Sequence, residues 1–298
     1  MTLQDPLTRF LLPTAGVRGV HVRLGPAWQD IRGQAEYPPA ARRLLGEGCV
    51  AAALFTGHTK VDGRLSVQLR GDGDSPLRTL FAECTAAGTL RGIVQLEDGG
   101  DAPSDLSTLG RGALLAITIE NPGLDPREPQ RYQSLVELNA GTLDEAFEDY
   151  FRQSEQLPTR LLLAADDQHA AGLLLQKLPG DGGDEDGWGR ASALFDTLST
   201  AELLDVDAHT LLHRLFHEEQ PQLLGEKSLA FGCSCSRDRV AAMLQSLGEE
   251  EARAAAEATG VVEIRCEFCG REYHFPLTEF GVLFGETPVG PPVSERLQ

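Results

Sequence analysis

The chain has 298 residues, which leaves room for about two domains of ordinary size. Its 45 Asp and Glu outnumber 26 Lys and Arg, and a net charge of −19 argues against nucleic acid or an anionic membrane as a partner. We find no apolar run near the roughly 18 residues of a membrane helix, and no secretory signal pattern at the start. We therefore expect a cytoplasmic protein, whose six cysteines serve as metal ligands, redox thiols or small buried hydrophobes.

The first part of the chain carries strand and helix patterns in irregular order. The predicted strands, rich in aliphatic and β-branched residues, are 17–24, 64–71, 91–97, 113–120, 131–138, 159–166 and 171–178. The Ala-rich residues 40–59 predict a helix, and so do residues 142–157, which Thr142 and Glu145 open with a capping-box pattern. Since the strands lack a regular alternation with helices, residues 1–179 predict an α+β domain with helices packed on an antiparallel sheet.

The composition changes sharply after residue 179. Residues 180–189 are mostly Gly and acidic, so they can neither bury apolar area nor hold a regular backbone. Two short amphipathic helices follow, with Leu194 and Leu198 on the apolar face of the first and Leu211 and Leu215 on that of the second. Helices this short are marginal unless they are docked. We therefore predict that residues 180–227 form a helical linker.

Four cysteines near the end of the chain form the strongest local pattern. Cys233 and Cys235 are separated from Cys266 and Cys269 by 30 intervening residues, and a glycine follows Cys269. Two such pairs can place four thiolates tetrahedrally around one Zn²⁺, and the glycine permits a tight turn. A shell closed by four cysteines leaves no position for water or substrate, so we expect one structural zinc per chain, bound by residues 228–298, and no catalytic residue.

Two other interpretations of the cysteines stay open. They could be four unrelated buried side chains, although two close pairs in so short a stretch argue against chance. Cys266 and Cys269 could also form a thioredoxin-type redox motif, but this needs a βαβ context, whereas residues 261–275 predict a strand, a metal-binding turn and a second strand.

The predicted zinc segment is small enough to depend on its metal. Zinc contributes on the order of 10 to 16 kcal/mol in comparable small sites, more than the total stability of a typical domain. Thiolate sulfur is oxidisable, and arginines flank both cysteine pairs. An oxidant would thus remove both the ligands and the folding free energy that the metal supplies. The alternative is a zinc domain that only holds structure and tolerates redox change.

Several other residues favour structural roles. His209, His213 and His217 are spaced to share a helix face. We expect this face to be an ordinary polar surface and not a metal or pH-sensing site. We assign His274 to a strand and Cys49 and Cys84 to the core. Residues 71–74, Gly-Asp-Gly-Asp, lack the full pattern of a phosphate or calcium loop and predict a hairpin turn.

Several motifs occur in an order that resembles a known family. They lie at residues 67–73, 131–138, 148–161, 211–219, 231–239 and 266–275, and EDYFRQSEQLPTRL at 148–161 is the most distinctive. Over nearly its whole length the chain resembles the 33 kDa chaperonin family, the redox-regulated heat-shock chaperones of bacteria. It departs from the family pattern in the loop at 71–80 and at His209 and His213.

The resemblance implies an amino-terminal substrate-binding domain, a metastable helical linker and a carboxy-terminal zinc domain. It also implies that oxidation pairs Cys233 with Cys235 and Cys266 with Cys269, and that the oxidised protein dimerises and holds unfolding clients without ATP. We expect clients on the amino-terminal sheet and on the linker faces of Leu194, Leu198, Leu211 and Leu215, since exposed apolar area binds unfolded chains irrespective of sequence.

The expected function is thus a non-enzymatic chaperone of oxidative and heat stress that prevents the aggregation of unfolding proteins. Two other classes remain as alternatives. The first is a zinc-ribbon module that binds nucleic acid or the ribosome, against which the net charge argues. The second is a thiol oxidoreductase that uses Cys266 and Cys269, which would turn over a disulfide substrate with a dithiol reductant.

Overall fold

The computed structural model describes residues 4–123, 129–136, 138–180, 183–257 and 259–285. Its contacts divide the chain into two units, residues 1–233 and 234–298. Each unit has a core of its own, and each is described by itself below. Among the described residues, no helix is both long enough and apolar enough to cross a membrane.

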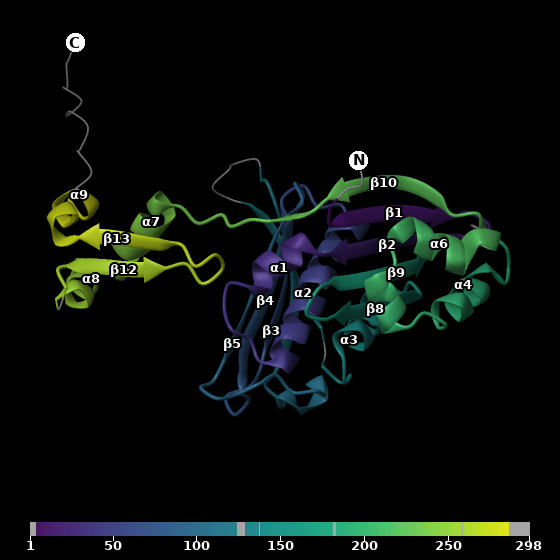
Figure 1. Ribbon diagram of the computed structural model, residues 1–298, viewed down its shortest axis with the longest axis horizontal. Coiled ribbons are helices and arrows are strands. Elements are labelled where there is room, and N and C mark those ends of the chain that lie inside the picture. The colour runs from purple at the N-terminus through teal and green to yellow at the C-terminus, as the bar shows by residue number, and fades with distance from the viewer. Residues whose placement is uncertain (1–3, 124–128, 137, 181–182, 258, 286–298) are drawn as a thin grey trace, which may run out of the picture. The chain divides into compact units, whose positions relative to one another are not determined.

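The first unit is built on two sheets (Figure 1). A five-stranded sheet has the order β10-β1-β2-β9-β8, and a six-stranded sheet has the order β11-β5-β4-β3-β6-β7. All pairs are antiparallel except β11 with β5, which confirms the predicted α+β class with antiparallel sheets. The strands are β1 (Pro6–Leu12), β2 (Val17–Leu24), β3 (Arg64–Arg70), β4 (Leu77–Thr85), β5 (Thr89–Leu96), β6 (Leu114–Asn121), β7 (Gln130–Val136), β8 (Thr159–Ala165), β9 (Ala170–Lys177), β10 (Gln222–Ser228) and β11 (Ala230–Phe231).

Helix α2 (Pro39–His58) forms the centre of the first unit. Twelve of its residues are buried, because it packs between the two sheets and contacts strands of both. The small Ala and Gly residues of α2 let the sheets approach the helix closely. A side chain at Gly46 would clash with Ala165, and one at Gly48 would clash with Leu80. Helix α1 (Pro26–Arg32) packs beside α2, and its N-terminal amides are bound by the carboxylate of Asp5.

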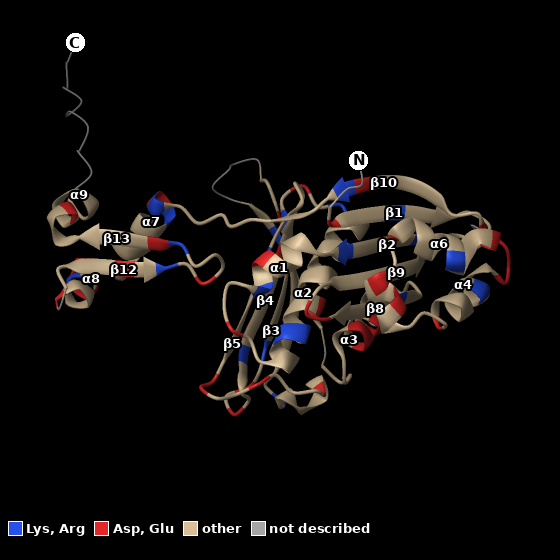
Figure 2. Cartoon of the chain, viewed as in Figure 1, with Lys and Arg blue, Asp and Glu red and all other residues tan. Residues whose placement is uncertain are grey.

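Residues 142–155 are helical as predicted, with one irregularity. Thr142 caps α3 (Leu143–Tyr150) by accepting from the Glu145 amide, and the Glu145 carboxylate accepts in turn from the Gly141 amide at 3.2 Å. The helix then widens into a π-helical turn, η2 (Phe151–Glu155), and ends at Gln156 in a left-handed conformation. Figure 2 shows acidic residues on α3. Two of them, Asp144 and Glu145, lie in its first turn, where negative charge interacts favourably with the helix dipole.

Three short helices cover the outer face of the five-stranded sheet, and we call them the linker helices. They are α4 (Gly187–Phe195), α5 (Thr200–Asp205) and α6 (Ala208–Phe216). Their apolar side chains form a second core with residues of β1, β2, β8 and β9. The prediction that residues 180–189 hold no regular backbone is wrong at its end, because α4 begins at Gly187, which is buried against Ala15. Residues 181–182 lie outside the described chain.

The second unit is a small α+β fold. It contains α7 (Arg237–Leu247), α8 (Glu249–Ala256), β12 (Val261–Arg265), β13 (Glu272–Pro276) and α9 (Phe280–Leu283). Strands β12 and β13 form the antiparallel pair predicted around the second cysteine pair. The second unit also contains the short turn η4 (Leu277–Glu279). The first unit contains two such turns, η1 (Leu106–Leu109) and η3 (His217–Glu219). Only seven apolar side chains are buried in the second unit, among its described residues.

Candidate metal centre

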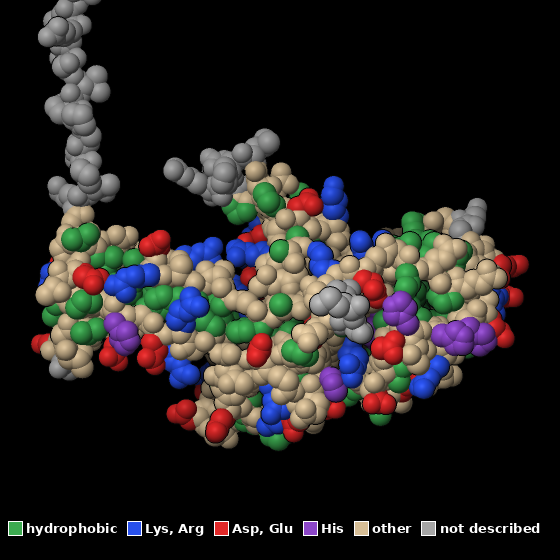
Figure 3. Space-filling model, turned by 45° about the horizontal axis from the view of Figure 1, so that its top comes forward, with side chains coloured by type: hydrophobic (Ala, Val, Ile, Leu, Met, Phe, Trp, Pro, Cys, Tyr) green, Lys and Arg blue, Asp and Glu red, His purple; other side chains and the backbone are tan. Residues whose placement is uncertain are grey.

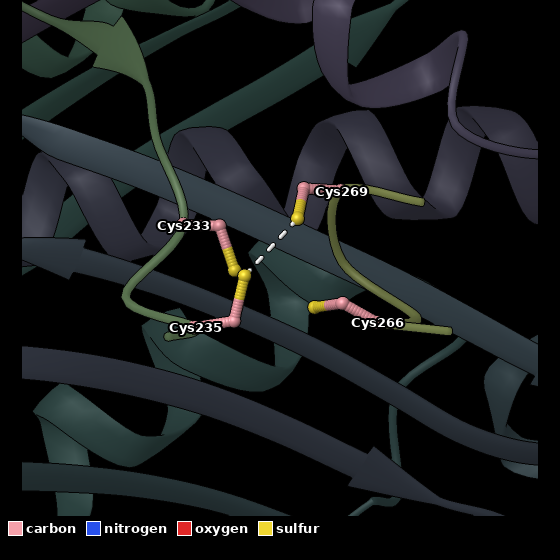
Figure 4. A group of neighbouring side chains, drawn as sticks. All are labelled: Cys233, Cys235, Cys266 and Cys269. Atoms are coloured by element: carbon pink, nitrogen blue, oxygen red, sulfur yellow. Dashed lines mark hydrogen bonds between the residues drawn. The ribbon is translucent and has the colours of Figure 1, made fainter. Parts of the chain in front are cut away.

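The side chains of four cysteines converge at one place. The sulfurs of Cys233, Cys235, Cys266 and Cys269 all lie within 4.8 Å of one another, and Figure 4 shows them pointing inward from two backbone segments. The sulfurs of Cys235 and Cys269 lie 3.3 Å apart. All four side chains are half-buried. The cluster is the only group of three or more potential ligands found in the described ranges.

The first cysteine pair lies between two ordered elements. Strand β11 pairs with β5, and the Gly232 amide donates to the Leu90 carbonyl at 3.1 Å, which fixes the backbone just before Cys233. Just after Cys235, Ser236 caps α7 by accepting from the Arg239 amide, and Arg239 Nη1 donates to the Ser234 carbonyl at 2.9 Å. These contacts hold the short Cys-Ser-Cys segment on both sides.

The second pair sits in the turn between β12 and β13. The Cys266 amide donates to the Arg271 carbonyl at 2.9 Å, and the Gly270 amide donates to the Cys266 carbonyl at 2.8 Å. Gly270 has a φ of 63°, in the left-handed region where a side chain would be strained. The glycine after Cys269 is therefore what lets the turn bring both sulfurs to the same side, as the sequence predicts.

Positive charge and one phenol surround the sulfurs. The pKa of Arg271 is raised by Tyr273 and by the nearby Cys235 and Cys269, and the nearby Cys235 raises the pKa of Tyr273. In the first unit, Arg91 Nη1 lies 3.9 Å from the Cys233 sulfur. Arg271 is one of the arginines that flank the cysteine pairs in the sequence. Arg91 and Tyr273 are not predicted from the sequence, because nothing in the spacing connects them to the cysteines.

The dimensions of the cluster fit a tetrahedral metal ion. A Zn²⁺ with bonds of about 2.3 Å to four sulfurs places those sulfurs about 3.8 Å apart, which agrees with a set that lies within 4.8 Å. Four thiolates without a nearby carboxylate ligand are the donor set that soft, tetrahedral ions prefer. The four cysteines can therefore hold one metal ion, and the set leaves no coordination position open.

The other candidate residues lie elsewhere. Cys49 and Cys84 are fully buried in the core, where burial raises the pKa of Cys84 to about 11 and that of Cys49 further. His274 lies on β13, as predicted. Histidine side chains reach the surface in Figure 3; those of His213 and His217 stack with ring centroids 5.5 Å apart. His209 contacts Glu226 at 3.2 Å, and the histidines join no ligand group within the described residues.

The four leucines expected to bind clients are covered in this structure. Leu198, Leu211 and Leu215 are buried, and Leu194 packs against the same core. Leu194 lies on α4, and Leu211 and Leu215 lie on α6. Leu198 lies in the turn between α4 and α5, so the single helix predicted to carry Leu194 and Leu198 is interrupted there. All four side chains pack in the core at the outer face of the five-stranded sheet. The structure thus supplies the partner that their apolar faces require.

A family model described as Hsp33 protein matches residues 5–276. The chain belongs to the Hsp33 family. Its relatives include the 33 kDa chaperonin of Ectopseudomonas mendocina (strain ymp), 43% identical over 291 residues, which are 95% of this chain and 96% of the relative. The 33 kDa chaperonin of Nitrosococcus oceani is 39% identical over 298 residues, covering 99% of this chain and all of the relative.

The fold agrees with the same Hsp33 family. The crystal structure of the 33 kDa chaperonin of Thermotoga maritima matches with a TM-score of 0.75 at 20% identity, covering 94% of this chain and 98% of that one. This likeness shows the fold alone. The Hsp33 family and the names of these relatives confirm the resemblance noted in the sequence and support a chaperone function.

Proposed function

We propose that this protein is a redox-regulated, ATP-independent holdase that binds unfolding proteins after oxidation of its four clustered cysteines. The observation that carries the proposal is the convergence of four sulfurs within 4.8 Å, three of them in a second unit whose described residues include only seven buried apolar side chains. A core of this size leaves the unit marginal alone. Membership of the Hsp33 family supports the chaperone part of the proposal.

In the reduced protein, Cys233, Cys235, Cys266 and Cys269 bind one zinc ion per chain. When bound, zinc crosslinks the two cysteine pairs and supplies folding free energy to residues 228–298. The chain's own residues hold the thiolates in place, through the caps and turns at Ser236 and Gly270. Nearby cations such as Arg271 stabilise the thiolate form, which is both the ligand and the oxidisable species.

Oxidation by a peroxide then removes the ligands. In each pair one S–S bond forms: the two thiolates give up two electrons, which with two protons from the solvent reduce one hydrogen peroxide to two waters. We assign the pairs as Cys233 with Cys235 and Cys266 with Cys269, as the family resemblance implies. A sulfur in a disulfide could no longer bind zinc as a thiolate, so the second unit would lose the folding free energy that the metal supplies and would unfold.

Unfolding of the zinc unit favours release of the linker helices, which are short and marginal without their docking surface. Undocking exposes the apolar faces of Leu194, Leu198, Leu211 and Leu215 together with the sheet beneath them. Burial of such area contributes about 25 cal/mol per Å² whatever the client sequence, which suits binding to unfolded chains. This three-part division into residues 1–179, 180–227 and 228–298 is part of the proposal.

We further propose that the protein acts in the cytoplasm, where thiols stay reduced until an oxidant arrives. Its partners are unfolding client proteins and, after oxidation, a second copy of itself; we propose no enzymatic activity, nucleic acid or membrane partner. The net charge of −19 supports the last two points.

The test follows light scattering of a heat-unfolding client in the presence of reduced, zinc-loaded protein or peroxide-treated protein. We expect suppression of aggregation only after oxidation, together with release of one zinc per chain and loss of far-UV circular dichroism. Equal suppression by both forms contradicts the redox switch. Turnover of a disulfide substrate with a dithiol reductant, or a salt-sensitive shift of nucleic acid, supports the rival functions instead.

A further inference from the structure

A histidine without partners lies under the linker helices. His21, in the middle of β2, is fully buried, and neither ring nitrogen has a hydrogen-bond partner among the described residues. Buried polar side chains are normally satisfied, and an exception needs an explanation. A neutral imidazole tolerates this position, but a charged one without a partner does not.

The alternation of β2 places His21 on the linker side of the sheet. Val20 and Val22 belong to the core around α2, whereas Val17 belongs to the core that the linker helices form. Successive side chains of a strand point to opposite faces, so His21 and Arg23 share the face of Val17. Arg23 confirms this, because its Nε donates to the carbonyl of Leu204 in α5 at 2.8 Å.

The charged groups around His21 do little to stabilise a protonated imidazole ring. Arg23 lies on the same strand and Asp207 at the start of α6; the Asp207 carboxylate already accepts from Thr210. On β1 the residue opposite His21 is Thr8, whose hydroxyl donates to Glu226 of β10. Glu226 also contacts His209 of α6.

The neighbours on the remaining elements are apolar or paired. On β9 the residue opposite His21 is Leu173. Glu202 of α5 pairs with Arg214 of α6, and Arg190 of α4 pairs with Glu219.

We propose that His21 makes docking of the linker helices sensitive to acid: protonation of its ring favours the undocked linker. Undocking lets water reach the imidazole and removes the low-dielectric cover. Docking of the linker helices then depends on pH as well as on oxidation, and the effect of pH arises beneath the helices without any change at the cysteines. Its consequence for client binding rests on the proposed function, but the undocking itself does not.

The direction of the effect follows from the titration. Burial lowers the pKa of His21 to about 4, with a further decrease from Arg23 and an opposing effect of Asp207. A solvated histidine has a pKa of about 6.5, so the undocked state binds more protons between these values. Docking is therefore fully favoured above about pH 6.5 and weakens as the pH falls toward 4, by on the order of 30-fold between pH 7.5 and 5.

A second buried histidine must be separated from this effect. Burial and the neighbouring Arg18 lower the pKa of His58 to about 4. His58 ends α2 and contacts Arg18 at 3.1 Å and the ring of Phe151, away from the linker helices. Its protonation would destabilise the first unit near α2 and η2, so the two histidines predict acid responses in different segments.

The experiment measures hydrogen exchange by mass spectrometry at pH 7.5 and 5 on reduced, zinc-loaded full-length protein, corrected for the intrinsic exchange rate. Peptides from residues 188–216 report the linker, and peptides from residues 39–58 report the core. We compare wild type with His21→Leu, which keeps the volume, with His21→Gln, which keeps a neutral polar group, and with His58→Gln. Zinc loss at low pH affects all variants alike, so their difference isolates each histidine.

From pH 7.5 to pH 5 we expect linker opening to increase on the order of 30-fold in wild type and in His58→Gln. Both His21 variants should lose most of this increase. His21 variants that keep the wild-type response overturn the proposal. The same variants should still be activated by peroxide. A failure of that response contradicts the proposed redox function and leaves the acid result readable on its own.

Discussion

Arg190 of α4 forms a two-point ion pair with Glu219 of η3. Its Nε donates to Oε1 at 2.8 Å and its Nη2 to Oε2 at 3.1 Å. Glu219 is only 3% exposed, and the same guanidinium also binds Asp184 at 2.9 Å. The pair therefore joins the first linker helix to the turn that follows the last one, and it holds a nearly buried carboxylate in place.

Removing this arginine should loosen the linker. Arg190→Gln leaves Glu219 as a buried charge without its partner, a change that is strongly destabilising, so we expect linker opening to increase at least tenfold. Arg214→Gln is the matched control, because Arg214 is half exposed and forms a surface ion pair with Glu202. Loss of such a pair should increase linker opening less than about fivefold. Hydrogen exchange of residues 188–216 in the zinc-loaded protein measures both. Equal effects would show that Glu219 does not need Arg190.

The buried face of α6 provides a way to undock the linker without oxidation. Leu211 is fully buried, and truncating such a leucine typically costs about 2 to 5 kcal/mol; Leu211→Asp adds a buried charge. We expect this variant to suppress client aggregation while reduced and still to contain one zinc per chain. Ala193→Asp, on the exposed side of α4, should behave like wild type. A reduced, folded Leu211→Asp without holdase activity contradicts the role of the linker helices.

The sequence predicted those elements whose own pattern is decisive. Strands such as β2 and β9 and the long α2 are apolar runs between turn residues, and each was assigned within a few residues. The four cysteines that the structure brings together are all predicted from the sequence, because their spacing places them in two close pairs. Strand β10 was not predicted: all but one of its residues are exposed, and it forms because it pairs with the edge of β1. Such a strand depends on its neighbour and has no pattern of its own.

The environment of His21 could not be predicted either. Val17–Leu24 indicates a strand, but only the tertiary structure shows that both faces of β2 are covered, one by α2 and one by the linker helices. The π-helical turn at Phe151–Glu155 is a similar case. The periodicity of residues 142–157 predicts a continuous helix, while packing of Phe151 against Phe55 and His58 accompanies the change in winding.

Glu47 predicts a pH dependence of a different sign from that of His21. It lies on α2 beside a cavity of about 200 Å³, near Arg43 and Asp144, and burial raises its pKa to about 7. The folded state thus favours the neutral acid, and its stability falls as the pH rises from 4.5 through 7. Glu47→Gln should raise the free energy of unfolding at pH 8 by up to about 3 kcal/mol and at pH 5 by less than about 1 kcal/mol.

Urea unfolding at the two pH values measures this difference. The exposed Glu36 provides the control, since Glu36→Gln should leave the free energy of unfolding unchanged within about 0.5 kcal/mol. A Glu47→Gln protein with the same stability as wild type at pH 8 would show that Arg43 compensates the buried charge fully.

The metal centre predicts that the fold of the second unit depends on all four cysteines. Cys266→Ser removes one thiolate from the set, so zinc content should fall from one per chain toward zero, and residues 234–285 should become sensitive to protease. Cys49→Ala, in the core of the first unit, should keep its zinc and stay resistant. Metal analysis and limited proteolysis of reduced protein test both variants, with chelator-treated wild type as a third sample. Because zinc contributes on the order of 10 kcal/mol in small sites, a second unit that stays folded without it would remove the basis of the redox switch.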